Sequence, residues 1–370
     1  MTNTLFDALM APHKGEARDF LILPDGSSLS YDDIHRLSGR LANLLTAQGV
    51  KPGDRVAVQV QKSPEALALY LATIRAGAVF LPLNTAYTPA EIAYFVGDAE
   101  PALVVCDPAR AARRDDFLPD GGKLMTLDAD GKGDLIEAAI CHAEVQNPVP
   151  RRGDDLAAIL YTSGTTGRSK GAMLSHDNLL SNARVLADAW RFTSEDVLLH
   201  ALPIFHTHGL FVASNVLMLA GGAMIWLPKF DATQVIELLP RATSMMGVPT
   251  FYTRLLDRPD FTGELVQKMR LFTSGSAPLL AETHRAFEDR TGHRILERYG
   301  MTETNMNTSN PYEGERRAGT VGFPLPGVAL RITGEDGSLL PRGEIGQIEV
   351  RGDNVFQGYW RMPDKTAEDL

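Results

Sequence analysis

The sequence predicts an α/β protein with two parallel-type sheets sandwiched by helices, followed by a small antiparallel β-barrel. Three observations support this prediction. Short apolar runs typical of buried strands alternate with helical segments through residues 31–310. A stretch rich in Gly, Asp, Pro and Arg, residues 120–155, divides this alternation into two halves. Beyond Asn310 the pattern changes to short strands between Gly and Pro turns, as in a small barrel.

The first half of the chain predicts helices and strands in alternation. The expected helices have recognisable starts, such as the capping box from Thr88 to Glu91 and the Ser63-Pro64 pair. The expected order is a helix over 30–49, a strand over 55–60, a helix over 63–77, a strand over 78–81, a helix from 88 and a strand over 102–106. Strands that alternate with helices in this way indicate a parallel sheet.

The second half continues the alternation, which indicates a second parallel sheet. The expected order is a strand over 156–160, a helix from 175, a strand over 197–200, a helix from about 209, a strand over 223–227, a helix from 231, strands over 245–248 and 271–273, a helix over 279–290 and a strand over 294–296. Strands over 329–332 and 346–350 belong to the expected barrel. We therefore expect subdomains over 1–155, 156–310 and 311–370.

Composition restricts the classes of partner. The 370 residues carry a formal net charge of −10 without a block of Lys and Arg, which argues against a nucleic-acid surface or an anionic membrane. Cys106 and Cys141 lack metal-ligand spacing and suit a reducing compartment. Residues 1–20 show no signal-peptide pattern, so we expect a cytoplasmic protein. The uncharged stretch 197–228 is interrupted by polar and glycine residues, so we expect a buried helix and strand there rather than a membrane span.

The stretch from Tyr161 to Gly171 is the strongest functional signal. It follows an apolar run and combines five Ser and Thr residues with three glycines and a lysine. The backbone N–H groups of such a loop can point at one oxyanion, and the lysine adds positive charge. The predicted phosphate-binding residues are Thr162, Ser163, Gly164, Thr165, Thr166, Gly167 and Lys170. The loop is not a Walker motif, because Ser169 replaces that motif's second glycine and Gly171 follows the lysine.

Four further motifs follow this loop. They are LPIFHTHG (residues 202–209), SGSAP (274–278), ERYGMTE (297–303) and GEIGQIEVRG (343–352). With the loop, they make the chain resemble the adenylate-forming superfamily of acyl- and aryl-CoA synthetases, peptide-synthetase adenylation domains and luciferases. The resemblance implies an N-terminal domain of two sheets and a small barrel. In the family a mobile C-terminal domain follows, which we expect to be absent from these 370 residues.

The resemblance implies a reaction in two steps. A substrate carboxylate attacks the α-phosphorus of ATP and expels pyrophosphate, which gives an acyl-adenylate. The thiol of coenzyme A then attacks the acyl carbon. In such a reaction the protein mainly positions the reactants and spreads charge. The expected cofactors and partners are therefore ATP, Mg²⁺, coenzyme A and a small-molecule acid.

The resemblance also implies roles for single residues. The phosphate loop would hold the β- and γ-phosphates of ATP, and Glu303 with Thr162 would position Mg²⁺. The residues expected to contact the adenine and the α-phosphate are Ser276, Ala277, Pro278, Glu297, Arg298, Tyr299, Gly300, Met301 and Thr302. Tyr299 would stack on the base. His206 would be an aromatic gate between the nucleotide and the thiol tunnel, while His208 is expected to be structural. The expected catalytic residues are Thr302, Glu303 and His206.

Two arginines suggest what kind of acid is the substrate. Adenylation domains for α-amino acids carry an Asp in the segment that aligns with Phe205-His206, and no Asp is present here. Instead, Arg254 and Arg298 stand near the expected acyl pocket, together with His206 as a further substrate contact. An arginine there suggests a second carboxylate, bound bidentately. Within the superfamily the chain looks most like malonyl-CoA synthetases. The alternative for Arg254 is a surface ion pair with Asp257 or Asp260.

We therefore expect the N-terminal part of an ATP- and Mg²⁺-dependent acid–thiol ligase that converts malonate, or a close short dicarboxylate, to its CoA ester. One alternative is a CoA ligase for another short-chain or aromatic acid. The other is a catalytically incomplete module that binds nucleotide and acid. Residues 363–370 begin a helix without finishing it, and the family's hinge, ribose-binding motif and catalytic lysine would lie beyond Leu370. We accordingly expect these residues alone to form the adenylate slowly.

Overall fold

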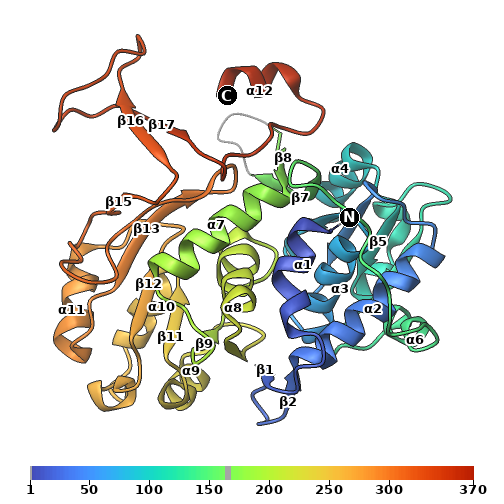
Figure 1. Cartoon of the computed structure of the whole chain (residues 1–370), viewed down its shortest axis with the longest axis horizontal. Helices are drawn as coiled ribbons and strands as arrows, with labels where there is room; N and C mark the ends of the chain where they lie inside the picture. The colour runs from blue at the N-terminus through green and yellow to red at the C-terminus, as the bar shows by residue number, and fades with distance from the viewer. Residues whose placement is uncertain (1, 163–167) are drawn as a thin grey trace.

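Two β-sheets with helices on both faces make up most of the protein (Figure 1). The computed structural model describes residues 2–162 and 168–370. Within these residues the sheets have six and nine strands, and a separate two-stranded ribbon lies towards the C-terminus. The predicted α/β class, with two parallel-type sheets sandwiched by helices, is confirmed.

The six-stranded sheet has the order β6-β5-β3-β4-β7-β8. Its strands are β3 (Arg55–Gln59), β4 (Val79–Pro82), β5 (Leu103–Cys106), β6 (Leu124–Thr126), β7 (Leu156–Thr162) and β8 (Lys170–Ser175). Neighbouring strands are parallel except for β7 and β8, which form an antiparallel pair. The helices of this part of the chain are α2 (Tyr31–Ala47), α3 (Pro64–Arg75), α4 (Pro89–Ala99), α5 (Pro108–Ala111) and α6 (Asp134–Ala139). The predicted caps are present, because Ser63 caps α3 and Thr88 forms a capping box with Glu91 at α4.

The nine-stranded sheet has the order β15-β14-β13-β12-β11-β9-β10-β1-β2. Its strands are β1 (Asp19–Ile22), β2 (Ser28–Ser30), β9 (Val197–His200), β10 (Ala223–Trp226), β11 (Ser244–Gly247), β12 (Leu271–Ser274), β13 (Leu296–Met301), β14 (Asn305–Ser309) and β15 (Phe323–Pro324). The central pairs from β1 to β13 are parallel, and the strands at both edges are antiparallel. The accompanying helices are α1 (Thr4–Met10), α7 (His176–Ala189), α8 (Asn215–Ala220), α9 (Ala232–Leu238), α10 (Pro249–Leu256) and α11 (Ala281–Thr291).

The main hydrophobic core lies between the two sheets. It combines apolar side chains of both sheets with those of α1, α2, α3, α7 and α8, and Figure 1 shows α1, α7 and α8 in the middle of the molecule. Along β3, Val56 and Val58 face this core while Ala57 faces a second core under α4. A third core lies on the outer face of the nine-stranded sheet, under α9, α10 and α11. Each sheet is therefore buried on both faces, as parallel strands require.

Strand pairing differs from the order expected along the chain. The strands β1 and β2 join the nine-stranded sheet beside β10, whereas β7 and β8, on either side of the phosphate loop, join the six-stranded sheet. Each sheet thus contains strands from both sides of residue 155, and the predicted subdomain boundaries stay a prediction. The expected loops over 120–155 include a short strand, β6, and a short helix, α6.

The uncharged stretch 197–228 is buried inside the fold. It forms β9, a π-helix over His208–Ser214, the short helix α8 and β10. The predicted helix from about residue 209 therefore starts as a π-helix. Among the helices of the described residues, none has both the length and the hydropathy that a membrane crossing requires.

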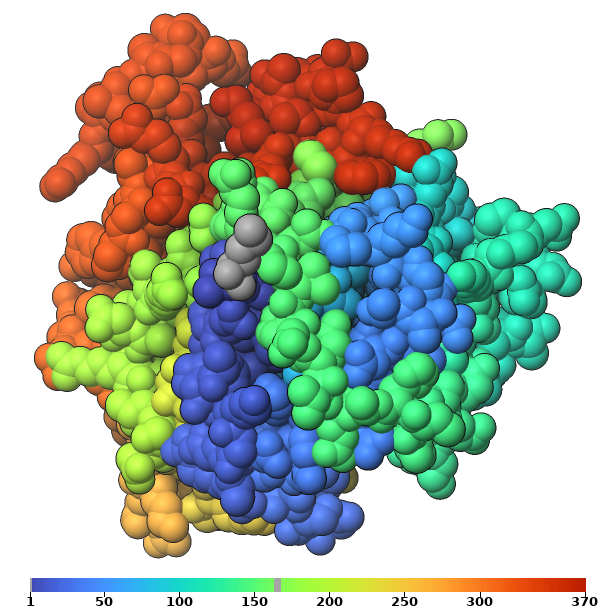
Figure 2. All heavy atoms as spheres, turned by 45° about the vertical axis from the view of Figure 1, so that its right-hand side comes forward, coloured from blue at the N-terminus to red at the C-terminus, as the bar shows by residue number. Residues whose placement is uncertain are grey.

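The predicted barrel is not formed as a closed structure by the described residues. Strands β16 (Ala329–Thr333) and β17 (Gln347–Arg351) pair antiparallel with each other as a separate ribbon. Much of this ribbon is exposed, including the apolar side chain of Ile348, so the strands lack the enclosed interior of a barrel. In the space-filling view the ribbon and the segment of helix α12 (Pro363–Asp369) stand above the two sheets as two protrusions (Figure 2).

Candidate active site

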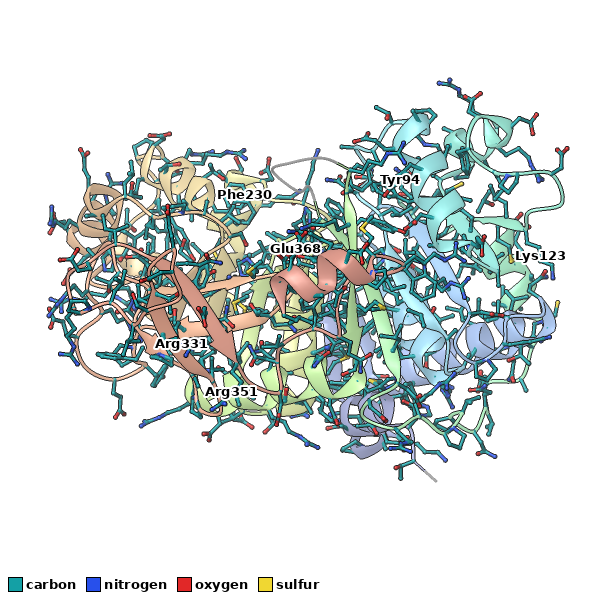
Figure 3. All side chains as sticks on the ribbon, turned by 90° about the horizontal axis from the view of Figure 1, so that it is seen from above. Tyr94, Lys123, Phe230, Arg331, Arg351 and Glu368 are labelled. Carbon is teal, nitrogen blue, oxygen red and sulfur yellow. The ribbon has the colours of Figure 1, made fainter. Side chains whose placement is uncertain are left out.

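A cavity of about 760 Å³ lies where the two sheets meet the C-terminal segment. It is lined by Tyr87, Tyr161, Thr162, Lys170, Leu202, Pro203, His206, Thr207, His208, Gly209, Val248, Ser276, Arg298, Gly300, Met301, Thr302, Glu303, Met306, Tyr359 and Asp369. Several of these residues follow the carboxyl ends of β9, β11 and β12, which is where ligands bind in open α/β sheets. Seen from above, α12 with Glu368 lies across the middle of the molecule (Figure 3).

The cavity brings together many residues that the sequence predicts for the site. They are Thr162, Lys170, His206, Ser276, Arg298, Gly300, Met301, Thr302 and Glu303. The predicted residues Ser163, Gly164, Thr165, Thr166 and Gly167 lie outside the described residues. Ala277, Pro278, Glu297 and Tyr299 are described but are not in the cavity lining. Glu297 is buried and accepts hydrogen bonds from the Gly319 N–H and the His284 ring, which fixes the start of β13.

Arg298 is a buried cation in the cavity lining. Its side chain is almost fully enclosed, with 3% of the residue exposed, and it packs on Gly275, where a Cβ atom would lie 2.3 Å from the guanidinium carbon. Burial lowers the pKa of Arg298 to about 10, so the group remains charged at neutral pH. Among the described residues, neither Nε nor Nη2 of this guanidinium has a hydrogen-bond partner. A buried cation of this kind favours an anionic ligand.

Two neighbours of Arg298 in the cavity also carry unpaired polar atoms. Thr207 Oγ1 and His208 Nε2 are buried and have no hydrogen-bond partner among the described residues. His208 Nδ1 lies 3.3 Å from the hydroxyl of Ser276. Burial, with a further contribution from Arg298, lowers the pKa of His208 well below its ordinary value, so the ring is neutral. This part of the cavity lining is thus polar, and His208 belongs to it, while its expected structural role stays a prediction.

His206 lies at the exposed rim of the same segment. Its ring is exposed towards the cavity and packs edge-on against Phe205, with 4.6 Å between ring centroids. Desolvation by its surroundings lowers the pKa of His206 below its ordinary value. A neutral, flat ring at a cavity rim suits the predicted role as a gate.

Lys170 and Glu303 line the cavity near the C-terminal segment. Lys170 Nζ is 3.6 Å from Asp369 Oδ2 and 4.3 Å from the ring centroid of Tyr359. Glu303 is buried, and its Oε1 accepts a hydrogen bond of 3.0 Å from the Tyr359 hydroxyl. Burial and the carboxylates of Glu303 and Asp369 raise the pKa of Tyr359, so its hydroxyl keeps its proton. Tyr359 therefore connects the two residues predicted for phosphate and metal binding.

The polar groups at this end fit a magnesium ion that arrives with phosphates. Glu303 offers a carboxylate and Thr162 a hydroxyl. The described residues contain no cluster of three or more acidic, His or Cys side chains that could hold a metal alone. Because Mg²⁺ is usually bound by one or two protein ligands together with phosphate oxygens, this donor set fits the ion only together with a nucleotide.

Sequence reasoning missed Tyr359 and Asp369. Both belong to the C-terminal segment, which pairs with β8 through hydrogen bonds from Met173 N to Gly358 O and from Trp360 N to Gly171 O. This pairing places Tyr359 beside Lys170. The aromatic residues within 356–360 could have indicated this contact, because large aromatic side chains in a polar segment usually pack against the rest of the fold.

Arg254 does not reach the cavity, which corrects its predicted role as a substrate contact. It lies on α10 with its side chain exposed, and its guanidinium stacks on Phe230 at 4.7 Å. The alternative of an ion pair with Asp257 or Asp260 is also not seen among the described residues, and Arg258 holds the carboxylate of Asp260. Helix α10 turns Arg254 outwards and buries Tyr252 and Leu255 instead.

Comparisons with known proteins identify the family of the chain. The family described as AMP-binding enzyme matches residues 10–360. The malonate–CoA ligase of Arabidopsis thaliana is 32% identical over 99% of the chain, and the sulfoacetate–CoA ligase of Cupriavidus necator is 32% identical over 95%. The chain spans 66% and 70% of these two relatives. Apo MatB from Rhodopseudomonas palustris superimposes with a TM-score of 0.96 at 57% identity, over 100% of this chain and 74% of MatB.

Proposed function

Because the chain belongs to the AMP-binding enzyme family, we propose that it activates malonate, or a close short dicarboxylate, with ATP and passes it to coenzyme A. One carboxylate of the acid would attack the α-phosphorus, with pyrophosphate leaving. The coenzyme A thiol would then attack the acyl carbon, with AMP leaving. The malonate–CoA ligase among the relatives supports this reaction, and so does the similarity to MatB.

In this proposal Arg298 determines which acid the protein accepts as substrate. Leaving an unpaired cation buried costs several kcal/mol, and a second carboxylate on the substrate would remove this cost. Arg298 can bind a carboxylate bidentately, while Thr207 and His208 offer further polar contacts in the same cavity. A long or aromatic hydrocarbon would instead leave these three groups unpaired. The polarity of the cavity therefore supports a short acid with a second negative group.

The nucleotide would lie in the part of the cavity beside the C-terminal segment. Lys170 and Thr162 would contact the outer phosphates, and Thr302 the α-phosphate. Glu303 and Thr162 would hold Mg²⁺ together with the phosphates, and the ion would neutralise charge on the leaving pyrophosphate. His206 would stand between the adenylate and the incoming thiol. The contribution of the protein in this proposal is to position two anions against each other and to exclude water.

A panel of acids tests this proposal. The full-length protein is given ATP, Mg²⁺ and coenzyme A with malonate, methylmalonate, butyrate or benzoate, and the release of pyrophosphate is measured. We expect kcat/KM for malonate to exceed that for butyrate by at least about 100-fold, because butyrate leaves Arg298 unpaired. Equal or faster turnover of butyrate or benzoate would contradict the dicarboxylate proposal and favour a ligase for ordinary monocarboxylic acids.

Sulfoacetate is a second candidate substrate. It resembles malonate with a sulfonate in place of one carboxylate, and the sulfoacetate–CoA ligase relative matches 95% of this chain. A guanidinium can bind either anion, so Arg298 alone does not separate them. Sulfoacetate therefore belongs in the panel. A kcat/KM for sulfoacetate above that for malonate would support this second candidate and would retain the role of Arg298.

A further inference from the structure

Lys62 is a buried lysine that the proposed reaction leaves unused. It follows β3 of the six-stranded sheet, and only 5% of the residue is exposed. Its Nζ lies 2.8 Å from His200 Nδ1 and 2.7 Å from the His200 carbonyl oxygen, and 4.1 Å from the ring centroid of Trp226. Among the described residues it forms no ion pair with a carboxylate. Lys62 thus crosses from one sheet to the other and ends on His200, the last residue of β9.

The contacts of His200 determine where its ring proton lies. Its Nε2 is 2.9 Å from the carbonyl oxygen of Gly209 and 3.3 Å from the Ser214 hydroxyl. The carbonyl can only accept a hydrogen bond, and the hydroxyl donates to that same carbonyl, so Nε2 carries the proton. Its Nδ1 then accepts from Lys62. Burial first, and the charge of Lys62 second, lower the pKa of His200 well below its ordinary value, so the ring is neutral. Lys62 and Gly209 therefore select the same tautomer from opposite sides of the ring.

The hydrogen bonds that run from Lys62 through His200 end at the Gly209 carbonyl oxygen. It also accepts a hydrogen bond of 3.0 Å from the hydroxyl of Ser214. The backbone is tightly folded here, because a Cβ atom on Gly209 would lie 1.9 Å from the Pro203 carbonyl oxygen. The residues enclosed by this turn include His206, Thr207 and His208, all of which line the cavity. A movement of the Gly209 carbonyl would therefore move the cavity wall.

We propose that Lys62 is a positioning residue for the cavity wall formed by residues 206–209. It donates to His200 Nδ1, keeps the His200 proton on Nε2, and so maintains the hydrogen bond to Gly209 that fixes this segment. Lys62 does not touch substrate in this proposal. It acts through His200, as partners of a working histidine commonly do when they set its tautomer. The kinetic consequence rests on the proposed function, whereas the tautomer does not.

Nitrogen-15 NMR of the histidine rings tests the first part of this proposal. In the unmutated protein at neutral pH we expect His200 to have a protonated Nε2 and an unprotonated Nδ1, with the signal assigned by its loss in His200→Gln. In Lys62→Met we expect part of the His200 population to carry the proton on Nδ1, so that the Nδ1 signal shifts towards that of a protonated nitrogen, and an unchanged signal would contradict the role of Lys62. Lys132→Met, the same change at an exposed lysine, should leave the spectrum unchanged. A protonated Nδ1 in the unmutated protein would overturn the proposal, even if Lys62→Met failed to fold.

Steady-state kinetics of the full-length protein test the second part. Lys62→Met should lower kcat for malonate-dependent pyrophosphate release roughly 10- to 100-fold, because a small misplacement of reacting groups has effects of this size. The KM for ATP should stay within about twofold, since Lys62 and His200 form no hydrogen bond with the described residues proposed to contact the phosphates. An unchanged kcat, or equal changes in kcat and in the KM for ATP, would refute a positioning role. If the unmutated enzyme turns over no acid, the proposed function fails and the NMR result still decides the tautomer.

Discussion

At the scale of single residues, Lys170 is where the phosphate site can be probed most directly. Its Nζ lies 3.6 Å from Asp369 Oδ2, so the lysine already forms an ion pair with a carboxylate. Lys170→Met should weaken MgATP binding by about 1.5 to 3 kcal/mol, the usual contribution of a hydrogen bond to a charged group. Asp369→Asn keeps the lysine and removes its competing charge, so MgATP affinity should hold or rise. Isothermal titration calorimetry measures both, and equal affinities for the two variants would contradict the assignment of Lys170.

Arg254 and Arg298, the two arginines predicted near the acyl pocket, differ in how well their positions could be predicted from the sequence. Arg298 lies inside the motif 297–303, whose residues 300–303 also line the cavity, and its placement follows from β13. Arg254 depends on the rotation of α10, which a sequence of eight helical residues does not determine to within one face. Tyr359 could not be placed at all, because its position depends on pairing between residues 357–360 and a strand far away in the chain.

At the scale of secondary-structure elements, Asp196 joins the starts of three strands of the nine-stranded sheet. It precedes β9, and its carboxylate accepts bonds of 2.6 and 2.8 Å from Arg270, just before β12, and 2.8 Å from Thr243, just before β11. Burial raises the pKa of Asp196, but the bonds from Arg270, the Thr193 N–H and Thr243 more than offset this, so the pKa lies below its ordinary value. The carboxylate therefore stabilises the folded state only when it is ionised.

Asp196→Asn should accordingly lower the free energy of unfolding at pH 7 by about 3 to 5 kcal/mol, because it breaks a buried pair. The pair contributes fully above the unfolded pKa of about 3.9 and is lost as the pH falls through the lower folded value. The difference in the free energy of unfolding between Asp196→Asn and the unmutated protein should therefore become smaller below about pH 4. Urea unfolding across this pH range measures it. Asp260→Asn breaks the exposed pair with Arg258 and should cost far less. Equal losses for the two variants would contradict the role of Asp196.

Elements with strong local signals were predictable, and elements defined by distant partners were not. The capping residues Ser63 and Thr88 begin α3 and α4 as expected. The short strand β6 has three residues within a polar stretch, too few for a pattern to indicate it. The described residues show no closed barrel, because turn-rich alternation indicates antiparallel strands without determining whether they close.

At the scale of the whole molecule, the cavity is built from both sheets and the C-terminal segment. A sequence pattern indicates that a strand exists but does not identify its partner, which is why β1 beside β10 and β7 beside β4 were unexpected. Residues 202–209 and 274–278 follow β9 and β12 at the cavity, and residues 297–303 include the end of β13, which lines it, whereas the motif 343–352 lies in the separate ribbon.

A ligand that contacts both sheets and the C-terminal segment should stabilise the whole fold against unfolding. MgATP at 100 times its dissociation constant should add about 2.7 kcal/mol to the free energy of unfolding, measured as a rise in Tm. Mg²⁺ alone should leave Tm unchanged, because the described residues offer no cluster of three or more metal-binding side chains. Addition of EDTA to the MgATP complex should remove much of the rise. A shift with Mg²⁺ alone, or no effect of EDTA, would contradict a metal site completed by the nucleotide.

The most direct test of the central claim compares Arg298→Met with Arg254→Met in the full-length protein. The claim is that the buried guanidinium of Arg298 selects an acid with a second negative group. Arg298→Met should lower kcat/KM for malonate by about 3 kcal/mol or more, roughly 150-fold, while turnover of butyrate stays equal or improves. Arg254→Met, an exposed arginine stacked on Phe230, should change neither acid. If Arg298→Met lowers turnover of malonate and butyrate by the same factor, or if Arg254→Met alone reverses the preference, the claim is wrong.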